Sequence, residues 1–437
     1  HAQDFKLTSS GYFKNQGVDV MAFDDIYPEG HQGGVCIIMN GHRVATNGDI
    51  RLEATPGQWQ PVPKQLDRKL GDNSITATLC YPDSSRHLTG FNPMIYPDLH
   101  LIYTVNVESK GKNIEVTVDL DRPIPQEFIG KVGFNLEFFP GSLFGKPWIM
   151  DGQSGIFPQQ PNSPLMTTQP NYLHTGNYHD GKKSLADMDK LIGKGYSPIV
   201  ADDIISEPYA KGTKFTSRPD DPYNKVTIES LSGDLQLFDG RMNHNNGWFV
   251  LRSNIKPGVT KGAVKWIITP NVVADWMYQP VIQTSQIGYH PTQDKEAVIE
   301  MDIRDNRKET AQIIRIDADG EKVVKNVTPA NWGKFLRYNY LKVNFTDVKE
   351  PGLYKIKYNT SVSPIFRIDN DVYARGVWQP VLEYFLPVQM CHMRVNEKYR
   401  VWHDCCHMDD AQMAPAHNHI DGYDQKEGLS KFKPGEV

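Results

Sequence analysis

Cysteine and histidine side chains gather near the C-terminal end of the sequence, between Cys391 and Asp421. This stretch holds three of the five cysteines and five of the fourteen histidines. Thiolate and imidazole groups at this density are the ligands that zinc prefers, and thiols also carry redox chemistry. The densest part reads Trp402-His403-Asp404-Cys405-Cys406-His407-Met408-Asp409-Asp410-Ala411. The residue types therefore predict a metal site or a redox site.

The composition is that of a globular protein with several domains. The chain has 437 residues, of which 39% are hydrophobic and 23% are charged, and its net charge is −5. This length exceeds a single ordinary core. The charge is small and negative, and there is no Lys/Arg run, so we expect no nucleic-acid partner. We also expect no membrane span, because no apolar run reaches about eighteen residues. The start at His1, without Met, indicates a mature or trimmed N-terminus after a removed signal peptide.

The elements that precede this stretch begin with a β-rich region, residues 1–280. Val35-Cys36-Ile37-Ile38-Met39 runs into Asn40-Gly41, and Asn47-Gly48 follows; Asn-Gly is the strongest short hairpin signal. Three later segments alternate apolar and polar residues. Their apolar positions are Ile75, Ala77, Leu79 and Tyr81, then Leu99, Leu101, Tyr103, Val105 and Val107, then Ile114, Val116, Val118 and Leu120. This pattern predicts a large antiparallel β-sandwich.

Alternation fades between residues 140 and 222, where we expect a long set of loops. The aromatic residues of these loops predict either a glycan-binding surface or simple anchoring of the loops; they are Phe144, Trp148, Phe157, Tyr172 and Tyr178. Strands return between Val226 and Ile268. Cys36 and Cys80 lie on predicted strands, and we expect two buried thiols, with a disulfide as the alternative.

Residues 281–369 predict an immunoglobulin-like sandwich, because six or seven short strands separated by turns follow one another there. The pattern then changes. Trp378, Leu382 and Phe385 recur at helical spacing, which predicts a helix with a wide apolar face. Residues 370–437 therefore begin a new, helical domain. The predicted fold is mainly β, with a large antiparallel sandwich, an Ig-like sandwich and then the start of an all-α domain.

The segment Gln283-Thr284-Ser285-Gln286-Ile287-Gly288-Tyr289-His290-Pro291 resembles the opening strand of the Ig-like domain that precedes many family 9 glycoside hydrolases. Tyr373-Ala374-Arg375-Gly376, Cys391 and the string from His403 to Ala411 resemble the start of that family's (α/α)6-barrel catalytic domain. The resemblance covers about residues 281–437. Residues 1–280 resemble, less specifically, the extra N-terminal region of Bacteroidetes-type members. The chain is thus similar to the N-terminal portion of such an enzyme, with the barrel cut short.

This resemblance implies an endo-β-1,4-glucanase of the cellulase type that hydrolyses cellulose, mixed-linkage glucan or xyloglucan with inversion. An inverting enzyme needs one carboxylate that activates water and one carboxyl group that protonates the leaving group. In the family, the base lies in an Asp-Ala-Gly-Asp motif and the acid is a Glu near the far end of the barrel; both would follow residue 437. The expected partners are a β-glucan polysaccharide or oligosaccharide, and the remaining part of the barrel in the same or a companion chain.

A structural zinc beside the active site is also implied by the resemblance. Carried over to this sequence, its first three ligands are Cys391, Cys406 and His407, and the fourth would follow residue 437. Buried thiols and polar loop histidines are the alternative interpretation of these residues. Calcium stays open as a second metal. The family further implies an exported protein, in the periplasm or at the outer-membrane surface, with or without a lipid anchor.

Two other classes of function stay open. In the first, the chain is a non-catalytic carbohydrate-binding or assembly protein in which residues 1–280 hold a glycan or a partner. In the second, it is a structural module stabilised by zinc. Candidate platforms on which a pyranose ring could stack are Tyr399, Trp402 and Tyr423.

Overall fold

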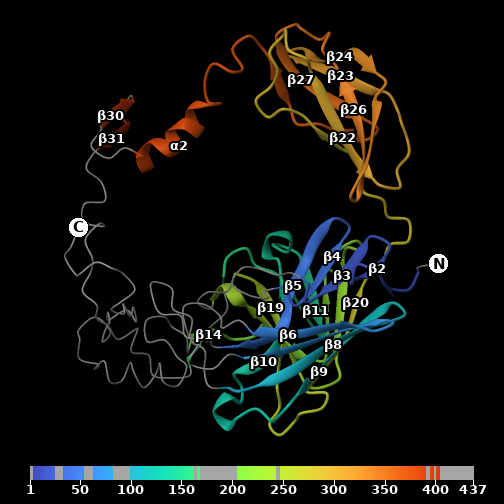
Figure 1. Cartoon of the computed structure of the whole chain (residues 1–437), viewed down its shortest axis with the longest axis vertical. Coiled ribbons are helices and arrows are strands. Elements are labelled where there is room, and N and C mark those ends of the chain that lie inside the picture. Colours follow the sequence, from blue (N-terminus) through green and yellow to red (C-terminus); the bar gives the residue numbers. More distant parts are fainter. Residues whose placement is uncertain are drawn as a thin grey trace. The chain divides into compact units, whose positions relative to one another are not determined.

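A computed structural model shows two compact units, one formed by the chain up to Trp276 and the other beginning at Met277 (Figure 1). The structure describes residues 3–24, 33–53, 63–81, 99–161, 165–167, 204–242, 247–389, 394–397 and 400–403. Among the helices of these residues, none is long and apolar enough to cross a membrane.

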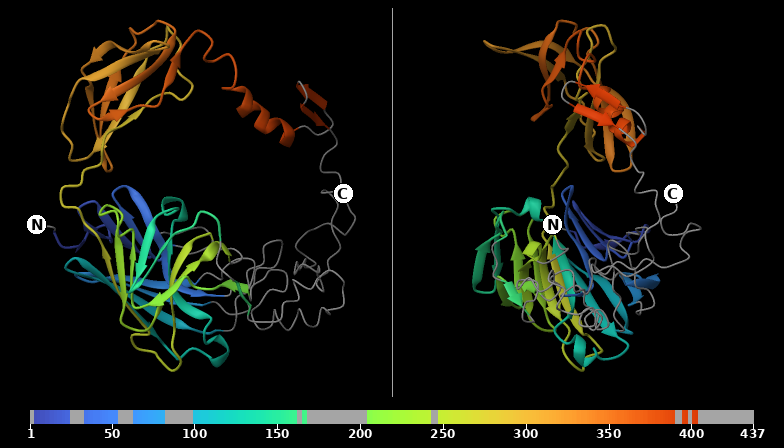
Figure 2. Two further views of the ribbon diagram at one scale, coloured as in Figure 1. Left: turned by 180° about the vertical axis from the view of Figure 1, so that it is seen from behind. Right: turned by 90° about the vertical axis from the view of Figure 1, so that its left-hand side faces the viewer.

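Two nine-stranded antiparallel sheets form the first unit, and Figure 2 shows them from two further sides. In spatial order, the first sheet contains β1 (Lys6–Leu7), β2 (Phe13–Asn15), β3 (Val18–Ala22), β4 (Val35–Met39), β5 (His42–Leu52), β10 (Val132–Phe138), β19 (Phe249–Asn254), β18 (Leu235–Asp239) and β15 (Ala210–Gly212). The second contains β12 (Gln153–Ile156), β11 (Pro147–Met150), β16 (Lys214–Ser217), β17 (Val226–Ser230), β20 (Val264–Pro270), β9 (Asn113–Leu120), β8 (Ile102–Lys110), β7 (Ser74–Cys80) and, at its edge, β6 (Lys64–Leu70). Smaller elements are the pair β13 (Leu165–Thr167) and β14 (Ile204–Ser206), and the 3-10 turns η2 (Gln126–Phe128), η3 (Pro140–Ser142) and η4 (Gly240–Met242).

The apolar faces of these two sheets share one core, which confirms the predicted β-sandwich. The alternating positions of β7, β8 and β9 are buried, as their period of two requires. Aromatic pairs join the sheets: Phe134 of β10 meets Trp266 of β20 with ring centroids 4.9 Å apart, and Phe138 meets Phe215 at 5.8 Å.

The two Asn-Gly pairs have different structural roles. Asn40-Gly41 turns between β4 and β5 with φ values of 51° and 85°, the conformation of a type I′ hairpin. The prediction of a second hairpin at Asn47-Gly48 is wrong, because β5 continues through it and the register with β4 shifts there. A bulge uses the same left-handed backbone as a turn, and Asn47 has φ of 55°.

The predicted loops between residues 140 and 222 contain six strands in the described part of the chain, β11 to β16. A glycan-binding surface is the wrong interpretation for Trp148 and Phe157, because both are buried in the core, and Phe144 packs against it. Tyr172 and Tyr178 lie outside the described residues. Cys36 of β4 is a buried thiol, and Cys80 of β7 is a half-buried thiol.

The second unit contains the predicted Ig-like sandwich. One sheet has the order β21 (Val281–Gln283), β22 (Glu296–Asp302), β26 (Tyr338–Asn344) and β25 (Ala330–Phe335). The other has β24 (Gly320–Val327), β23 (Ala311–Asp317), β27 (Gly352–Tyr358) and β28 (Ser361–Val362), with β29 (Phe366–Ile368) also paired to β27. Apolar residues from both sheets form a second core between them.

The predicted helix follows this sandwich as α2 (Gln379–Gln389), and β30 (Arg394–Glu397) pairs with β31 (Arg400–His403) after it. The apolar stripe expected on the helix is present. However, Trp378, Leu382 and Phe385 are 57%, 50% and 50% exposed, so the described residues do not bury it. The (α/α)6 barrel that the helix was expected to begin stays a prediction.

Candidate functional site

The three predicted zinc ligands, Cys391, Cys406 and His407, lie outside the described residues. The structure therefore neither brings them together nor separates them. No group of three or more His, Cys, Asp or Glu side chains within the described part of the chain is arranged to hold a metal ion. What supports zinc is the donor set, because two thiols and an imidazole are three of the four ligands of a closed Cys2His2 site.

The segment that resembles the opening of a cellulase Ig-like domain is held against the end of that domain by Tyr289. Its backbone N–H donates to Arg367 O at 2.9 Å, and its carbonyl accepts from Asp369 N at 3.1 Å. Its hydroxyl group donates to Glu296 O at 3.1 Å and accepts from Ser285 N at 3.0 Å. The ring is buried between Phe345 and Phe366. Tyr289 therefore joins the first strands of the Ig-like unit to its last one.

Gly288 makes this joint possible. It has φ of +100°, and a Cβ atom at this position would lie 2.3 Å from the Arg367 carbonyl oxygen. Only glycine tolerates both conditions. The Gly288-Tyr289 pair in the motif is thus explained by packing of the chain.

Lys295 stabilises the same end of the unit from inside. Its side chain is fully buried, and Nζ donates to the carbonyl oxygens of Pro291, Gln293 and Thr346 at 2.7, 3.1 and 3.1 Å. Burial lowers the pKa of Lys295. Three carbonyl acceptors satisfy all three ammonium protons, which is how an isolated buried cation is tolerated.

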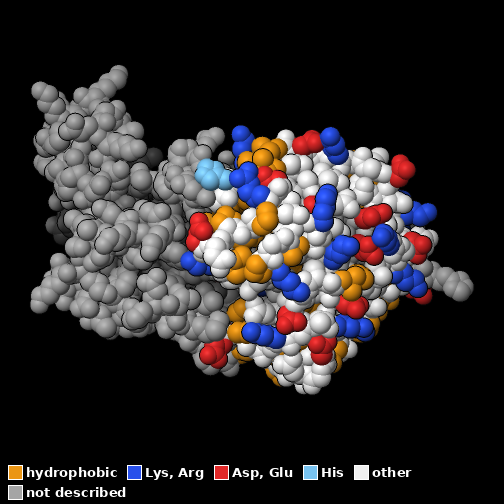
Figure 3. Space-filling model, turned by 90° about the horizontal axis from the view of Figure 1, so that it is seen from below, with side chains coloured by type: hydrophobic (Ala, Val, Ile, Leu, Met, Phe, Trp, Pro, Cys, Tyr) orange, Lys and Arg blue, Asp and Glu red, His pale blue; other side chains and the backbone are white. Residues whose placement is uncertain are grey.

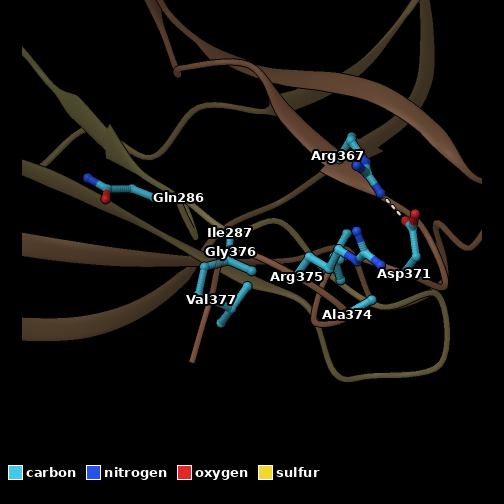
Figure 4. A pocket seen from close by; sticks show the side chains of 9 residues that line it. Gln286, Ile287, Arg367, Asp371, Ala374, Arg375, Gly376 and Val377 are labelled. Atoms are coloured by element: carbon cyan, nitrogen blue, oxygen red, sulfur yellow. Dashed lines mark hydrogen bonds and ion pairs between the residues drawn. The ribbon is translucent and has the colours of Figure 1, made fainter. Parts of the chain in front are cut away.

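An open pocket of about 580 Å³ lies where the Ig-like unit passes into α2 (Figure 4). Figure 4 shows Arg367 pointing toward Asp371, with which it forms an ion pair, while Gln286 lies at the other side of the pocket. The remaining lining residues are Ile287, Val372, Ala374, Arg375, Gly376 and Val377.

The segment 373–376, which resembles the beginning of the catalytic domain, contributes Ala374, Arg375 and Gly376 to this lining. Its first two residues form hydrogen bonds. Tyr373 donates its hydroxyl proton to Gln293 Oε1 at 2.7 Å, and Gln379 Nε2 donates to Ala374 O at 3.0 Å. The pocket is therefore the joint through which the Ig-like unit sets the start of α2.

A second candidate is a buried polar network on the first sheet. Phe134, Leu136 and Phe138 of β10 belong to the core, so Asn135 and Glu137 point to the opposite face. Both are nevertheless buried. Asn47 Nδ2 donates to Glu137 Oε2 at 2.8 Å, and Asn135 Nδ2 donates to Glu53 Oε1 at 3.2 Å.

Two buried arginines balance the carboxylates of this network. Arg51 Nη1 lies 3.2 Å from Asp49 Oδ2, and Arg252 Nη1 donates to Asn135 Oδ1 at 2.8 Å. Burial raises the pKa of Asp49 and raises the pKa of Glu137 to about 7, although Arg51 opposes both shifts. A carboxyl group that titrates near neutrality often marks an acid–base site. Here, however, the contacts of these groups join β5, β10 and β19 to one another. Asp49 also accepts a hydrogen bond at 2.8 Å from the Tyr103 hydroxyl group of β8, so the network has a structural role that extends to the second sheet.

Charges of both signs lie on the visible face of the first unit. Figure 3 shows Lys and Arg side chains interspersed with Asp and Glu over the described part of the visible face. The expectation that the chain has no nucleic-acid partner stays a prediction.

The Ig-like unit has exposed aromatic residues that were not predicted from the sequence. Trp332 and Phe335 lie on β25 and are 54% and 57% exposed. The signal in the sequence that could have identified them is a pair of large aromatic residues in a segment where apolar and polar residues do not alternate regularly.

The Ig-like unit resembles a known protein family. Residues 277–363 match the family described as "Cellulase N-terminal ig-like domain". Comparison with curated proteins gives no significant match. A solved structure described as "Bacteroides ovatus GH9" is 24% identical over 27% of this chain and 20% of that chain, with a TM-score of 0.21, so the match spans about a fifth of its length. Residues 277–363 are therefore similar to a cellulase N-terminal Ig-like domain, the domain that the resemblance to family 9 glycoside hydrolases implied.

Proposed function

We propose that the chain is the N-terminal part of an exported glycoside hydrolase that cleaves β-1,4-glucans with inversion. The observation that carries this proposal is the cellulase-type Ig-like domain at residues 277–363, followed directly by the segment 373–376 and by α2. In this proposal residues 370–437 begin the catalytic barrel, and the base and acid carboxylates follow residue 437. An inverting pair stands ~6.5–9.5 Å apart, which leaves room for the attacking water.

The described residues contribute positioning to this reaction. Tyr289, Gly288 and Lys295 hold the end of the Ig-like unit together. Tyr373 contacts Gln293 of that unit, and Gln379 links the beginning of α2 to Ala374. A rigid attachment matters because small displacements of catalytic groups cost rate.

Cys391, Cys406 and His407 would hold a structural zinc, with a fourth ligand after residue 437. When bound, zinc would supply a cross-link between the beginning of the barrel and the loop that carries the base. The ligands would have to be two thiolates and a neutral imidazole, so they would release protons when the metal binds.

The experiment is to sequence the gene beyond the codon for residue 437 and to assay the full gene product for glucan hydrolysis. We expect an Asp-Ala-Gly-Asp-type motif soon after residue 437 in the gene, and reducing-sugar release from at least one of xyloglucan, mixed-linkage β-glucan and carboxymethylcellulose. If the gene product has no such motif and releases no sugar, the enzyme proposal is wrong. A non-catalytic carbohydrate-binding protein then becomes the better description.

A further inference from the structure

The outer face of the sheet β21-β22-β26-β25 carries a shallow hollow of about 230 Å³. We call this surface the aromatic platform; it is lined by Val298, Trp332, Phe335, Tyr340 and Lys342. Trp332 and Phe335 expose apolar surface together here, and clustered exposed apolar surface is a feature of interaction sites.

Strand geometry explains why these side chains share a face. Leu341 and Val343 of β26 are buried in the core, so Tyr340 and Lys342 point outward. In β25, the register with β26 shifts between Asn331 and Gly333. A bulge redirects the side chain that it carries, and Trp332 sits at the shift. Alternation alone would not place Trp332 and Phe335 in one hollow.

Ring contacts support Trp332 and Tyr340 before any ligand binds. Trp332 meets Tyr340 edge to face, with ring centroids 5.6 Å apart at 89°. Tyr340 in turn lies 6.1 Å from Tyr338, and Tyr338 lies 5.2 Å from Tyr278. A row of supported rings presents apolar area at little cost in side-chain entropy.

Polar groups border the rings. Glu300 of β22 accepts hydrogen bonds from the hydroxyl groups of Tyr278 at 3.0 Å and Tyr340 at 3.4 Å. Lys342, the cation among the lining residues, pairs with Glu296 at 3.3 Å. The platform thus offers ring faces, hydroxyl groups and a carboxylate, while its cation is already neutralised.

We propose that the aromatic platform binds a neutral polysaccharide chain, a β-glucan, by stacking of a pyranose ring on Trp332. The apolar C–H face of a pyranose matches the indole, and its hydroxyl groups match Glu300 and the tyrosine hydroxyl groups as donors and acceptors. Lys342 is the one cation of the lining, and the carboxylates of Glu296 and Glu300 lie beside it, so the local charge disfavours phosphate, nucleic acid and anionic lipid.

The size of the hollow specifies how the ligand lies. Pockets that enclose a whole small molecule measure ~300–1,000 Å³, and this hollow of about 230 Å³ is smaller and open. It therefore fits one ring of a polymer whose remaining units run along the sheet surface. The site would hold polysaccharide near the enzyme and perform no chemistry itself.

The choice of β-glucan rests on the proposed function, but its test does not use catalysis. The chain of residues 1–437 is run through native gels that contain mixed-linkage β-glucan or xyloglucan. We expect retardation of the wild type, and roughly tenfold weaker binding for Trp332→Ala, the scale of losing one well-packed aromatic contact. Trp378→Ala is the matched control, because Trp378 is 57% exposed yet lies outside the platform, and it should bind like the wild type.

Fluorescence gives a second measurement that does not depend on mobility. Saturating oligosaccharide should shift the emission of the wild type and of Trp378→Ala to shorter wavelength, and should leave Trp332→Ala unchanged. Equal binding by Trp332→Ala, or no binding of either polysaccharide by the wild type, overturns the proposal.

Concentration-dependent protection of β25 and β26 by a second protein molecule, measured by hydrogen exchange, would instead assign the platform to a protein partner. Failure of the longer gene product to hydrolyse glucan would overturn the proposed function and leave the gel result intact.

Discussion

Replacement of Glu137 by Gln should remove a large part of the pH dependence of stability of the first unit. Glu137 is buried on β10, where Asn47 donates to its Oε2 atom at 2.8 Å. Burial raises its pKa from an ordinary value of 4.5 to about 7, against the opposing charge of Arg51. The glutamine side chain has the same shape, can accept the same hydrogen bond from Asn47, and does not ionise.

Proton linkage determines whether the free energy of unfolding rises or falls with pH. Between pH 4.5 and about 7, the folded protein binds a proton at Glu137 that the unfolded chain has already released. The free energy of unfolding of the wild type therefore falls as the pH rises through this window. At ~1.4 kcal/mol per pH unit, the full loss is about 3 kcal/mol. Glu137→Gln should lack this loss, so its stability relative to the wild type should rise by about 3 kcal/mol from pH 4.5 to pH 8.

Urea unfolding at a series of pH values, followed by tryptophan fluorescence, measures this difference. Trp148 and Trp266 are buried in the core of the first unit and report its unfolding. Glu127→Gln is the control, because Glu127 is exposed in η2. If the wild type and Glu137→Gln keep the same dependence on pH, the inferred pKa and the role assigned to burial are both wrong.

Three further changes test the second unit and the metal site. Gly288→Ala should lower the melting temperature of the Ig-like unit by roughly 10 °C in calorimetry, because a Cβ atom would lie 2.3 Å from the Arg367 carbonyl oxygen; an unchanged melting temperature would contradict the geometry. Lys295→Met should cost about 2 kcal/mol in urea unfolding, since three buried carbonyl groups lose their donor, and a neutral result would show that water replaces the ammonium group. Metal analysis of the full gene product should find about one zinc per chain, lost in Cys406→Ser and kept in Cys80→Ser; zinc-free wild-type protein would exclude the site.

Much of the fold could be predicted because the strands obey their period. The apolar positions of β7, β8 and β9 alternate, and one face of each strand is buried, so pattern and structure agree. The hairpin prediction failed where the same backbone conformation occurs both in a hairpin turn and in a bulge. Asn47-Gly48 has the backbone of a hairpin turn, yet the hydrogen bond from Asn47 to Glu137 belongs to a bulge inside β5.

The site could be predicted only in part. The opening motif of the Ig-like domain was recognisable because Gly288 and Tyr289 are constrained by the backbone of Arg367. The polar network could not be predicted, because Asp49, Glu53 and Glu137 occupy positions that the alternating pattern assigns to water. Their burial depends on contacts between distant strands, which no local pattern encodes. Cys391, Cys406 and His407 stay predictions.

The edge of the second sheet has a consequence for how this protein behaves when it is concentrated. An edge strand offers a template to which another extended chain can add. Strand β6 exposes Lys64, Asp67 and Lys69, and its register with β7 shifts between Gln65 and Asp67. Charged side chains and a bulge both prevent such addition. If the chain binds polysaccharide as proposed, molecules crowded along one fibre would meet at β6 without joining their sheets there.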